Sequence, residues 1–113
     1  MTADRDGLPA LDDAPELEPA IEVVEPAALA SPLVLSSPHS GHIYPASFLA
    51  MSRLDASALR RSEDSYVDDL MRPATAHGAP LLRALFPRAY LDVNREPFEL
   101  DPRMFDGRLP AHV

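Results

Sequence analysis

Hydrophobic residues gather into short runs after residue 31, and each run ends at a turn signal. The first run, residues 32–36, is continuous and closes at the Pro- and Gly-containing segment 37–41. A continuous apolar run of this kind predicts a strand that is buried on both faces of a sheet. The later runs, residues 81–86 and 89–93, predict two further strands, or one strand with an irregular break.

Three helical segments are predicted between these strands. Pro45 favours a helix over residues 45–51 by occupying its first turn, and Asp55 is placed to cap a second helix over residues 56–61. Ser62 predicts the start of a third helix, which breaks or kinks at Pro73. The order strand, helices, strand indicates the beginning of an α/β layer fold. A sheet of so few strands leaves an inner edge bare, which favours self-association through that edge.

Acidic residues dominate the first 30 residues. Eight of them stand there against Arg5 alone, which places a net charge of −7 out of the total −8 in this stretch. Self-repulsion and four prolines oppose packing, so we predict a disordered acidic tail over residues 1–30 and a folded domain over residues 31–113. Within the tail, residues 20–24 are able to pair as a short strand.

The composition narrows the classes of partner. A net charge of −8 argues against nucleic acid and against an anionic membrane surface, because both bind basic patches. The chain has no cysteine, which excludes disulfides and thiolate metal sites. No apolar run approaches the roughly 20 residues that cross a bilayer. We therefore expect a cytoplasmic protein.

His39 is the first candidate for chemistry. It follows the first predicted strand, and open α/β sheets bind ligands beyond the carboxyl ends of their strands. A histidine there could bind a metal or relay a proton, and the alternative is a histidine hydrogen-bonded within the turn. We interpret His42, three residues later, as an exposed loop histidine.

Two groups of charged residues are further candidates. On a helix that starts at Ser62, Asp64 and Asp68 share one face, and paired carboxylates need a cation or an arginine nearby. The alternative is that Glu63 and Asp64 complement the helix dipole while Asp68 is solvated. The second group is defined by its place in or beside the last predicted strand, and it consists of Arg88, Asp92, Asn94 and Arg95.

The arginines of this second group have two possible uses. A buried Asp92 needs a charged partner, which Arg88 or Arg95 could supply as a structural ion pair. A guanidinium fork can also hold a substrate carboxylate through two parallel hydrogen bonds. The sequence contains no Gly-rich phosphate loop, no Gly-x-Ser-x-Gly and no His-Glu-x-x-His motif.

Four segments, in this order and spacing, resemble the N-formylglutamate amidohydrolase family. They are Leu-Val-Leu-Ser-Ser-Pro-His-Ser-Gly at 33–41, Ser-Glu-Asp-Ser-Tyr-Val-Asp-Asp-Leu at 62–70, Gly-Ala-Pro-Leu-Leu-Arg at 78–83 and Arg-Ala-Tyr-Leu-Asp-Val-Asn-Arg-Glu-Pro at 88–97. The resemblance implies part of a three-layer α/β/α architecture, phosphorylase/hydrolase-like and related to zinc carboxypeptidases. It also implies hydrolysis of N-formyl-L-glutamate to L-glutamate and formate, a step of histidine degradation.

The resemblance also implies roles for individual residues. It makes His39 a zinc ligand, with Asp64 the second ligand and Glu63 the other choice. Asp68 and Asp92 are then expected to support the ligands. Arg88, Asn94 and Arg95 are expected to bind the carboxylates of an N-acyl amino acid.

Length is where the chain departs from the family. Family members continue past the position of Val113, and the resemblance places another histidine ligand and the general base in that continuation. We therefore expect the general base beyond Val113, and we expect 113 residues to form an incomplete zinc site with little or no hydrolysis. The alternative is a non-catalytic fold fragment, or a protein-binding module that uses its exposed sheet edge.

Overall fold

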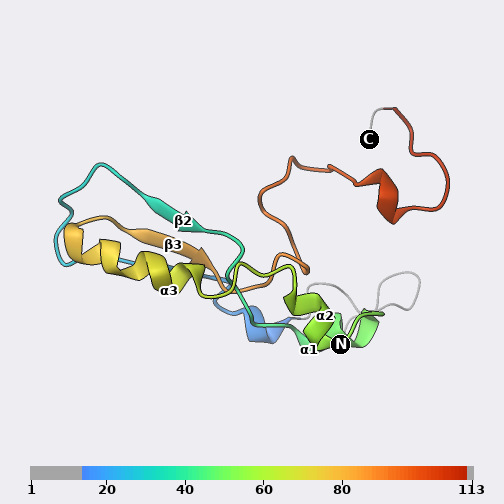
Figure 1. The fold of residues 1–113 in the computed structure, drawn as a ribbon, viewed down its shortest axis with the longest axis horizontal. Helices are drawn as coiled ribbons and strands as arrows, with labels where there is room; N and C mark the ends of the chain where they lie inside the picture. The colour runs from blue at the N-terminus through green and yellow to red at the C-terminus, as the bar shows by residue number, and fades with distance from the viewer. Residues whose placement is uncertain (1–13, 112–113) are drawn as a thin grey trace.

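The computed structural model describes residues 14–111 (Figure 1). Its sheet consists of β1 (Ile21–Val24), β2 (Leu35–Ser37) and β3 (Leu81–Ala84) in the order β1-β3-β2. β2 runs parallel to β3 and β1 runs antiparallel to it. The helices are α1 (Ala46–Met51), α2 (Ala56–Arg60) and α3 (Val67–Met71), and the 3-10 turns are η1 (Pro15–Leu17), η2 (Arg72–His77) and η3 (Pro102–Met104).

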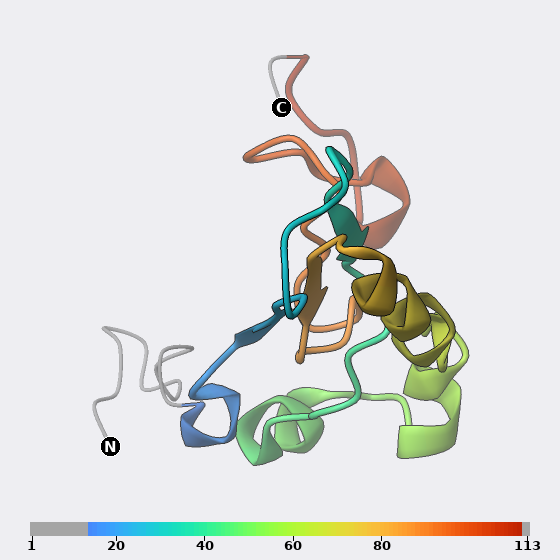
Figure 2. The same ribbon diagram turned by 90° about the vertical axis from the view of Figure 1, so that its left-hand side faces the viewer.

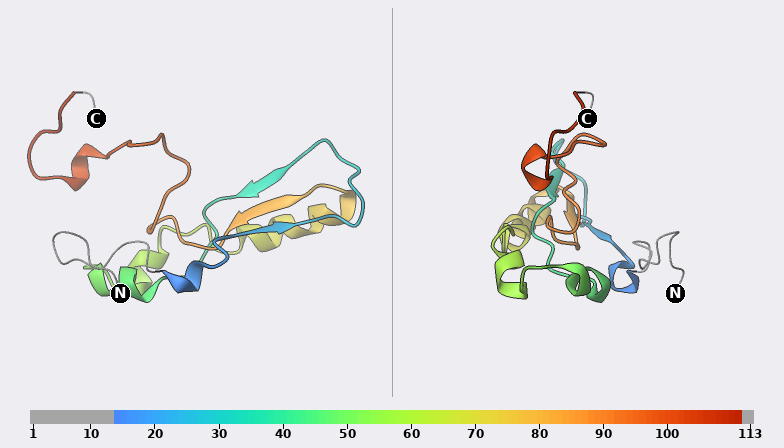
Figure 3. Two further views of the ribbon diagram at one scale, coloured as in Figure 1. Left: turned by 180° about the vertical axis from the view of Figure 1, so that it is seen from behind. Right: turned by 90° about the vertical axis from the view of Figure 1, so that its right-hand side faces the viewer.

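The central strand β3 organises the core. Leu81 has no exposed surface, and Ala84 packs near Leu17 and Phe86 in the main buried cluster. The continuous helical segment formed by α3 and η2 lies along one face of the sheet (Figures 2 and 3). On that face the sheet is screened from solvent by a helix, which explains why the middle strand is the most buried.

Two predicted helices are confirmed. α1 begins directly after Pro45, and α2 begins after Asp55, whose side chain accepts a hydrogen bond from the Ala58 amide at 2.8 Å. The start of α2 follows from local chemistry, because aspartate caps free amides. Pro45 precedes α1 with a ψ of 139°, so it lies outside the first helical turn that it was expected to occupy. Gly78, at a φ of 85°, ends η2 just before β3.

The third helix begins later than its predicted cap. α3 starts at Val67, its preceding residue Tyr66 has a φ of 66°, and Ser62 does not cap it. The reason is tertiary, because the Asp64 amide donates to the carbonyl of His39 at 3.0 Å and holds residues 62–66 in a turn. Asp64 and Asp68 therefore do not share a helix face. The predicted break at Pro73 falls within η2.

Two strand predictions are wrong in part. β2 is an edge strand of residues 35–37, so Leu33 and Val34 are exposed instead of buried on both faces. Residues 89–93 form turns and no strand, with the Tyr90 and Leu91 amides both donating to the carbonyl of Pro87. Proline lacks an amide donor and fixes φ, which favours a turn over a ladder here.

The acidic stretch differs from the expected disordered tail from Ala14 onwards. Leu17 is buried, and β1 pairs with β3 along its whole length, as the possible strand at residues 20–24 suggested. Pairing is compatible with the charge because Glu22 forms ion pairs with Arg83 and Arg72. Residues 1–13 lie outside the described part of the chain, and the division into a tail and a domain at residue 31 stays a prediction.

The fold class is mixed α/β, with a small three-stranded sheet and short helices. A complete three-layer arrangement stays a prediction, because α3 and η2 flank only one face along β1 and β3. Across residues 14–111, no helix has both the length and the apolar character that a membrane crossing requires.

Candidate metal and carboxylate site

The His39 turn is fixed by short polar contacts and a close backbone approach. The buried hydroxyls of Ser37 and Ser40 hydrogen-bond to each other across it. A Cβ on Gly41 would overlap the backbone of Leu85 and Phe86, so only glycine fits there. Because β2 and β3 are parallel, their carboxyl ends meet at this edge, which is where an α/β sheet positions a ligand site.

The imidazole of His39 lies between two carboxylates. Its Nε2 is 2.8 Å from Oδ1 of Asp92, and its Nδ1 is 3.7 Å from Oδ2 of Asp64. His39 itself is buried, whereas the Asp64 side chain is 53% exposed. The Nε2 side of the ring is therefore held inside the protein by Asp92. The Nδ1 side faces the partly exposed carboxylate of Asp64, which leaves room for a further ligand.

Asp92 determines which ring nitrogen carries the hydrogen. Burial raises the pKa of its carboxyl, but hydrogen bonds from the Asn94 amide, from His39 and from Arg88 outweigh burial and hold the pKa at about 2. An ionised carboxylate only accepts hydrogen bonds, so Nε2 of His39 must donate. In the neutral imidazole the lone pair then lies on Nδ1, on the side of Asp64.

Glu63 and Asp64 differ in their availability. The Glu63 side chain is 1% exposed, accepts hydrogen bonds from the Tyr44 hydroxyl and from Ser65 at 3.1 Å, and forms an ion pair with Arg60 at 3.3 Å. Burial and the nearby Glu63 carboxylate both raise the pKa of Tyr44, so its hydroxyl stays a donor. Glu63 is thus saturated by its own donors, and Asp64 is the acidic residue that could take a metal.

The predicted carboxylate-binding residues converge on Asp92. Arg88 Nη2 donates to its Oδ2 at 3.0 Å, Arg95 Nη2 is 3.8 Å from the same oxygen, and the Asn94 amide donates to Oδ1 at 3.0 Å. The Asp92 side chain is partly buried, at 19% exposed, and both arginines supply its charged partners. The Arg95 side chain is 52% exposed, so much of its guanidinium faces solvent.

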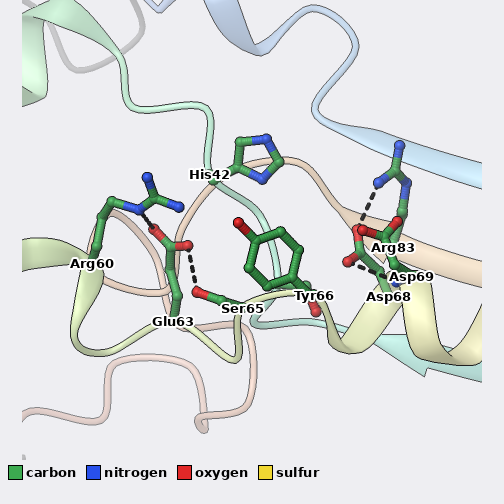
Figure 4. A pocket seen from close by; sticks show the side chains of 9 residues that line it. His42, Arg60, Glu63, Ser65, Tyr66, Asp68, Asp69 and Arg83 are labelled. Carbon is green, nitrogen blue, oxygen red and sulfur yellow. Dashed lines mark hydrogen bonds and ion pairs between the residues drawn. The ribbon is translucent and has the colours of Figure 1, made fainter.

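Asp68 lies apart from His39. It is buried and binds Arg83 at 2.6 Å, and Arg83 in turn binds Glu22 at 3.0 Å. A cavity of about 100 Å³ separates this pair from Glu63, with Tyr66 between them (Figure 4). The sequence indicated that Asp68 needs an arginine or a cation, and the structure supplies the arginine.

The geometry of His39 and Asp64 is compatible with a zinc ion. Two ligand atoms of a tetrahedral zinc lie about 3.4 Å apart, given bond lengths near 2.1 Å. The 3.7 Å separation of Nδ1 and Oδ2 is close to that value. Metal-binding histidines commonly donate their other nitrogen to a carboxylate, as His39 does to Asp92. Within residues 14–111, however, no group of three or more His, Asp and Glu side chains is placed to hold a metal ion.

The position of the general base stays a prediction, as do the roles of the other site residues. It is expected beyond Val113, and Val113 itself lies outside the residues that the structure describes, as does His112. Asp92 is a poor substitute, because a carboxyl with a pKa of about 2 takes up a proton weakly near neutral pH. Glu63 is equally unsuited, since its oxygens already accept two hydrogen bonds and form an ion pair with Arg60.

Sequence reasoning missed the contacts that hold the site together. Ser37, Ser40 and Gly41 all lie in the turn that carries His39, so their small size was a usable signal. The contact between Tyr44 and Glu63 had no sequence signal, because 19 residues separate the partners and neither lies in a periodic pattern. Loop-to-loop hydrogen bonds of this kind follow from the fold alone.

Comparison with known proteins assigns the family. The family model for N-formylglutamate amidohydrolase matches residues 31–112. A crystal structure of N-formylglutamate amidohydrolase from Ralstonia eutropha JMP134 is 40% identical, with a TM-score of 0.68 over 80% of this chain. The match covers 33% of that chain, so this chain spans about one third of the length of that relative. Among curated proteins there is no match. Since the family model covers most of the sequence, including His39, Asp64 and Asp92, the chain belongs to the N-formylglutamate amidohydrolase family.

Proposed function

We propose that this chain supplies part of the active site of a zinc-dependent hydrolase that converts N-formyl-L-glutamate and water to L-glutamate and formate. The observation that supports the proposal is the placement of His39. Its Nε2 is held by Asp92 at 2.8 Å, and its Nδ1 faces Asp64 at 3.7 Å. A structural histidine needs only one such partner, whereas a metal ligand needs a free nitrogen and a second ligand nearby.

His39 and Asp64 would hold the zinc ion, and Asp92 would orient the imidazole. When bound, zinc supplies polarisation of the formyl carbonyl and a water of lowered pKa. Asp92 stays ionised near neutral pH, so it keeps Nε2 protonated and the lone pair of Nδ1 directed at Asp64. The hydrogen bond from the Asp64 amide to the His39 carbonyl holds the two ligand segments together.

Arg88 and Arg95 would bind the carboxylates of the substrate. Arg88 uses one terminal nitrogen on Asp92, and Arg95 is half exposed beside it. Each guanidinium has five N–H donors, so contact with Asp92 leaves donors for a second carboxylate. The same ion pairs fix the orientation of both arginines before a substrate arrives, which lowers the entropic cost of binding. Asn94, whose backbone amide donates to Asp92 and whose carbonyl accepts from Arg95, would add a further polar contact.

We further propose that the 113-residue chain alone hydrolyses little or no substrate. A catalytic zinc takes three protein ligands and a water, and residues 14–111 offer His39 and Asp64. A general base is also unassigned among them. In this proposal the remaining ligand and the base come from polypeptide equivalent to the part of the Ralstonia relative that the match leaves uncovered.

The test compares the 113-residue chain with a chimera in which it replaces the matching third of the Ralstonia relative. We expect zinc-dependent release of glutamate from N-formylglutamate by the chimera and none by the chain alone. In the chimera, His39→Ala and Asp64→Ala should abolish release, whereas the matched change Asp69→Ala at an exposed neighbouring carboxylate should not. Full activity of the Asp64→Ala chimera would contradict the assigned ligand pair.

A further inference from the structure

Two hydrogen bonds join the segment that carries His39 to the segment that carries Asp64. The first runs from the Asp64 amide to the His39 carbonyl at 3.0 Å. The second is made by side chains, and it runs from the Tyr44 hydroxyl to the carboxylate of Glu63. Tyr44 follows His39 in the loop between β2 and α1, and Glu63 directly precedes Asp64. The side-chain contact therefore bridges the same two segments as the backbone hydrogen bond.

The backbone of Tyr44 is held on both sides. Before it, the Ile43 amide donates to the carbonyl of Leu85 at 3.0 Å, just past the end of β3. After it, Pro45 is fully buried. The Tyr44 hydroxyl thus projects from a fixed part of the fold, and a donor in a fixed place restricts where its acceptor can lie.

Glu63 has contacts along the turn of residues 62–66. Its carboxylate accepts from the Ser65 hydroxyl at 3.1 Å and forms an ion pair with Arg60 at 3.3 Å (Figure 4). The turn ends at Tyr66, whose φ of 66° is a conformation that a bulky residue keeps only where surrounding contacts enforce it. The contacts of the Glu63 carboxylate therefore help to hold this turn in its shape.

Asp64 depends on this turn for its position. Its side chain is 53% exposed, and among the residues that the structure describes its carboxylate pairs with His39 alone, at 3.7 Å from Nδ1. No further side chain fixes that carboxylate directly. We propose that Tyr44 is a positioning residue for the metal site, and that it acts through Glu63 to keep Asp64 at ligand distance from His39. This inference rests on the proposed zinc site.

The test compares Tyr44→Phe with Tyr66→Phe in the full 113-residue chain. Each change removes one phenolic oxygen, but Tyr66 is 68% exposed and takes no part in the contact with Glu63. The first measurement needs no metal, because hydrogen exchange of the Asp64 amide reports its bond to the His39 carbonyl. Tyr44→Phe should speed this exchange about tenfold, as the loss of one hydrogen bond implies, and leave the amides of β3 unchanged. Tyr66→Phe should change neither.

The second measurement is the zinc affinity of His39, followed by its imidazole NMR resonances. Tyr44→Phe should weaken binding about tenfold, the lower end of the effect of groups that orient a metal ligand, and Tyr66→Phe should not. Glu63→Gln keeps an oxygen that accepts from Tyr44 and should retain most of the affinity, whereas Glu63→Leu should lose it as Tyr44→Phe does.

Zinc affinity that is equal in Tyr44→Phe and in the wild type overturns the inference. Exchange that Tyr44→Phe speeds equally at Asp64 and throughout β3 also overturns it, because that result shows a loss of global stability and not of position. Absence of zinc binding by the wild-type chain has a different meaning: it overturns the proposed function, and this inference with it.

Discussion

At the scale of single residues, the four carboxylates of the site differ in how many hydrogen bonds and ion pairs they already form. Glu63 is hydrogen-bonded to a tyrosine and a serine and ion-paired with an arginine, and Asp68 is ion-paired with Arg83. Asp92 shares its two oxygens among His39, Arg88 and a backbone amide. Asp64 is the most exposed of these four carboxylates, and it faces a histidine nitrogen. The contacts that each carboxylate already makes therefore indicate which one remains available to bind a metal ion.

Asp92→Asn tests the support that His39 receives. An asparagine carries no charge and its amide can donate, so Nε2 loses its anionic acceptor and both tautomers of His39 become accessible. We expect zinc affinity at His39 to fall about 10- to 100-fold, as for other changes to groups that orient a metal ligand. Zinc titration followed by imidazole NMR resonances measures this. Asp101→Asn is the control, because Arg103 likewise holds the pKa of Asp101 at about 2 in the C-terminal loop.

Much of this site can be predicted from the sequence. His39, Asp64, Asp92, Arg88 and Arg95 are all candidates on sequence grounds, and the structure brings them together. The choice between Glu63 and Asp64 cannot be made from sequence, because it depends on Tyr44 from a distant loop. Helical spacing groups Asp68 with Asp64, and that grouping is wrong because the helix starts after Asp64.

At the scale of elements, β3 separates two environments. Leu81 lies on the same face as Arg83, which pairs with Asp68 of α3, and it has no exposed surface, whereas the adjacent Leu82 lies on the other face and is 37% exposed. Successive strand residues point to opposite faces, so the exposure of these two leucines shows how well each face of the sheet is covered. They form a natural matched pair for mutation.

Leu81→Ala should lower the free energy of unfolding by about 2–5 kcal/mol, because it creates a cavity in packed surroundings. Leu82→Ala should lower it by at most about 1 kcal/mol, since part of that side chain is already in water. Urea unfolding followed by circular dichroism measures both. Equal losses would mean that both faces of β3 are covered alike, which contradicts the exposure of Leu82.

The ion pairs of β1 predict a dependence of stability on pH. The hydrogen bond from Arg83 lowers the pKa of Glu22 below its ordinary value of 4.5, despite the opposing effect of burial. A depressed pKa stabilises the fold above the ordinary value, and the stabilisation disappears as pH falls through the folded-state pKa. The Tm difference between the wild type and Glu22→Gln should therefore be largest above pH 4.5 and vanish in acid. Glu25→Gln, at an exposed glutamate beyond β1, should show no such trend.

The elements are predictable where local chemistry decides them. α1 and α2 follow from Pro45 and Asp55. The late start of α3 depends on the hydrogen bond from the Asp64 amide to the distant His39 carbonyl. The turn after Pro87 is local, because the Tyr90 and Leu91 amides both donate to the Pro87 carbonyl. The strand at Ile21–Val24 forms despite its charged surroundings because basic partners arrive from β3 and η2. The contacts of β1 with β3 and η2 therefore outweigh the unfavourable negative charge of the surrounding sequence.

At the scale of the whole molecule, the candidate site and the exposed apolar residues of the sheet lie at different places. The parallel pair β2 and β3 directs His39 and Asp92 to one edge, where residues 62–66 add Asp64. Ile21, Val23 and Leu82 lie along β1 and β3 and are partly exposed. The account therefore predicts that substitutions at these three positions leave zinc binding at His39 and Asp64 unchanged.

Zinc titration of the 113-residue chain, followed by the imidazole NMR resonances of its histidines, tests the central claim most directly. The account predicts that zinc shifts the His39 resonances and leaves those of the exposed His42 and His77 unchanged. It also predicts that Asp64→Ala removes the shift and that Asp69→Ala, the matched exposed carboxylate, does not. An unchanged His39 at millimolar zinc, or a shift that survives Asp64→Ala, would contradict the assignment of His39 and Asp64 as metal ligands.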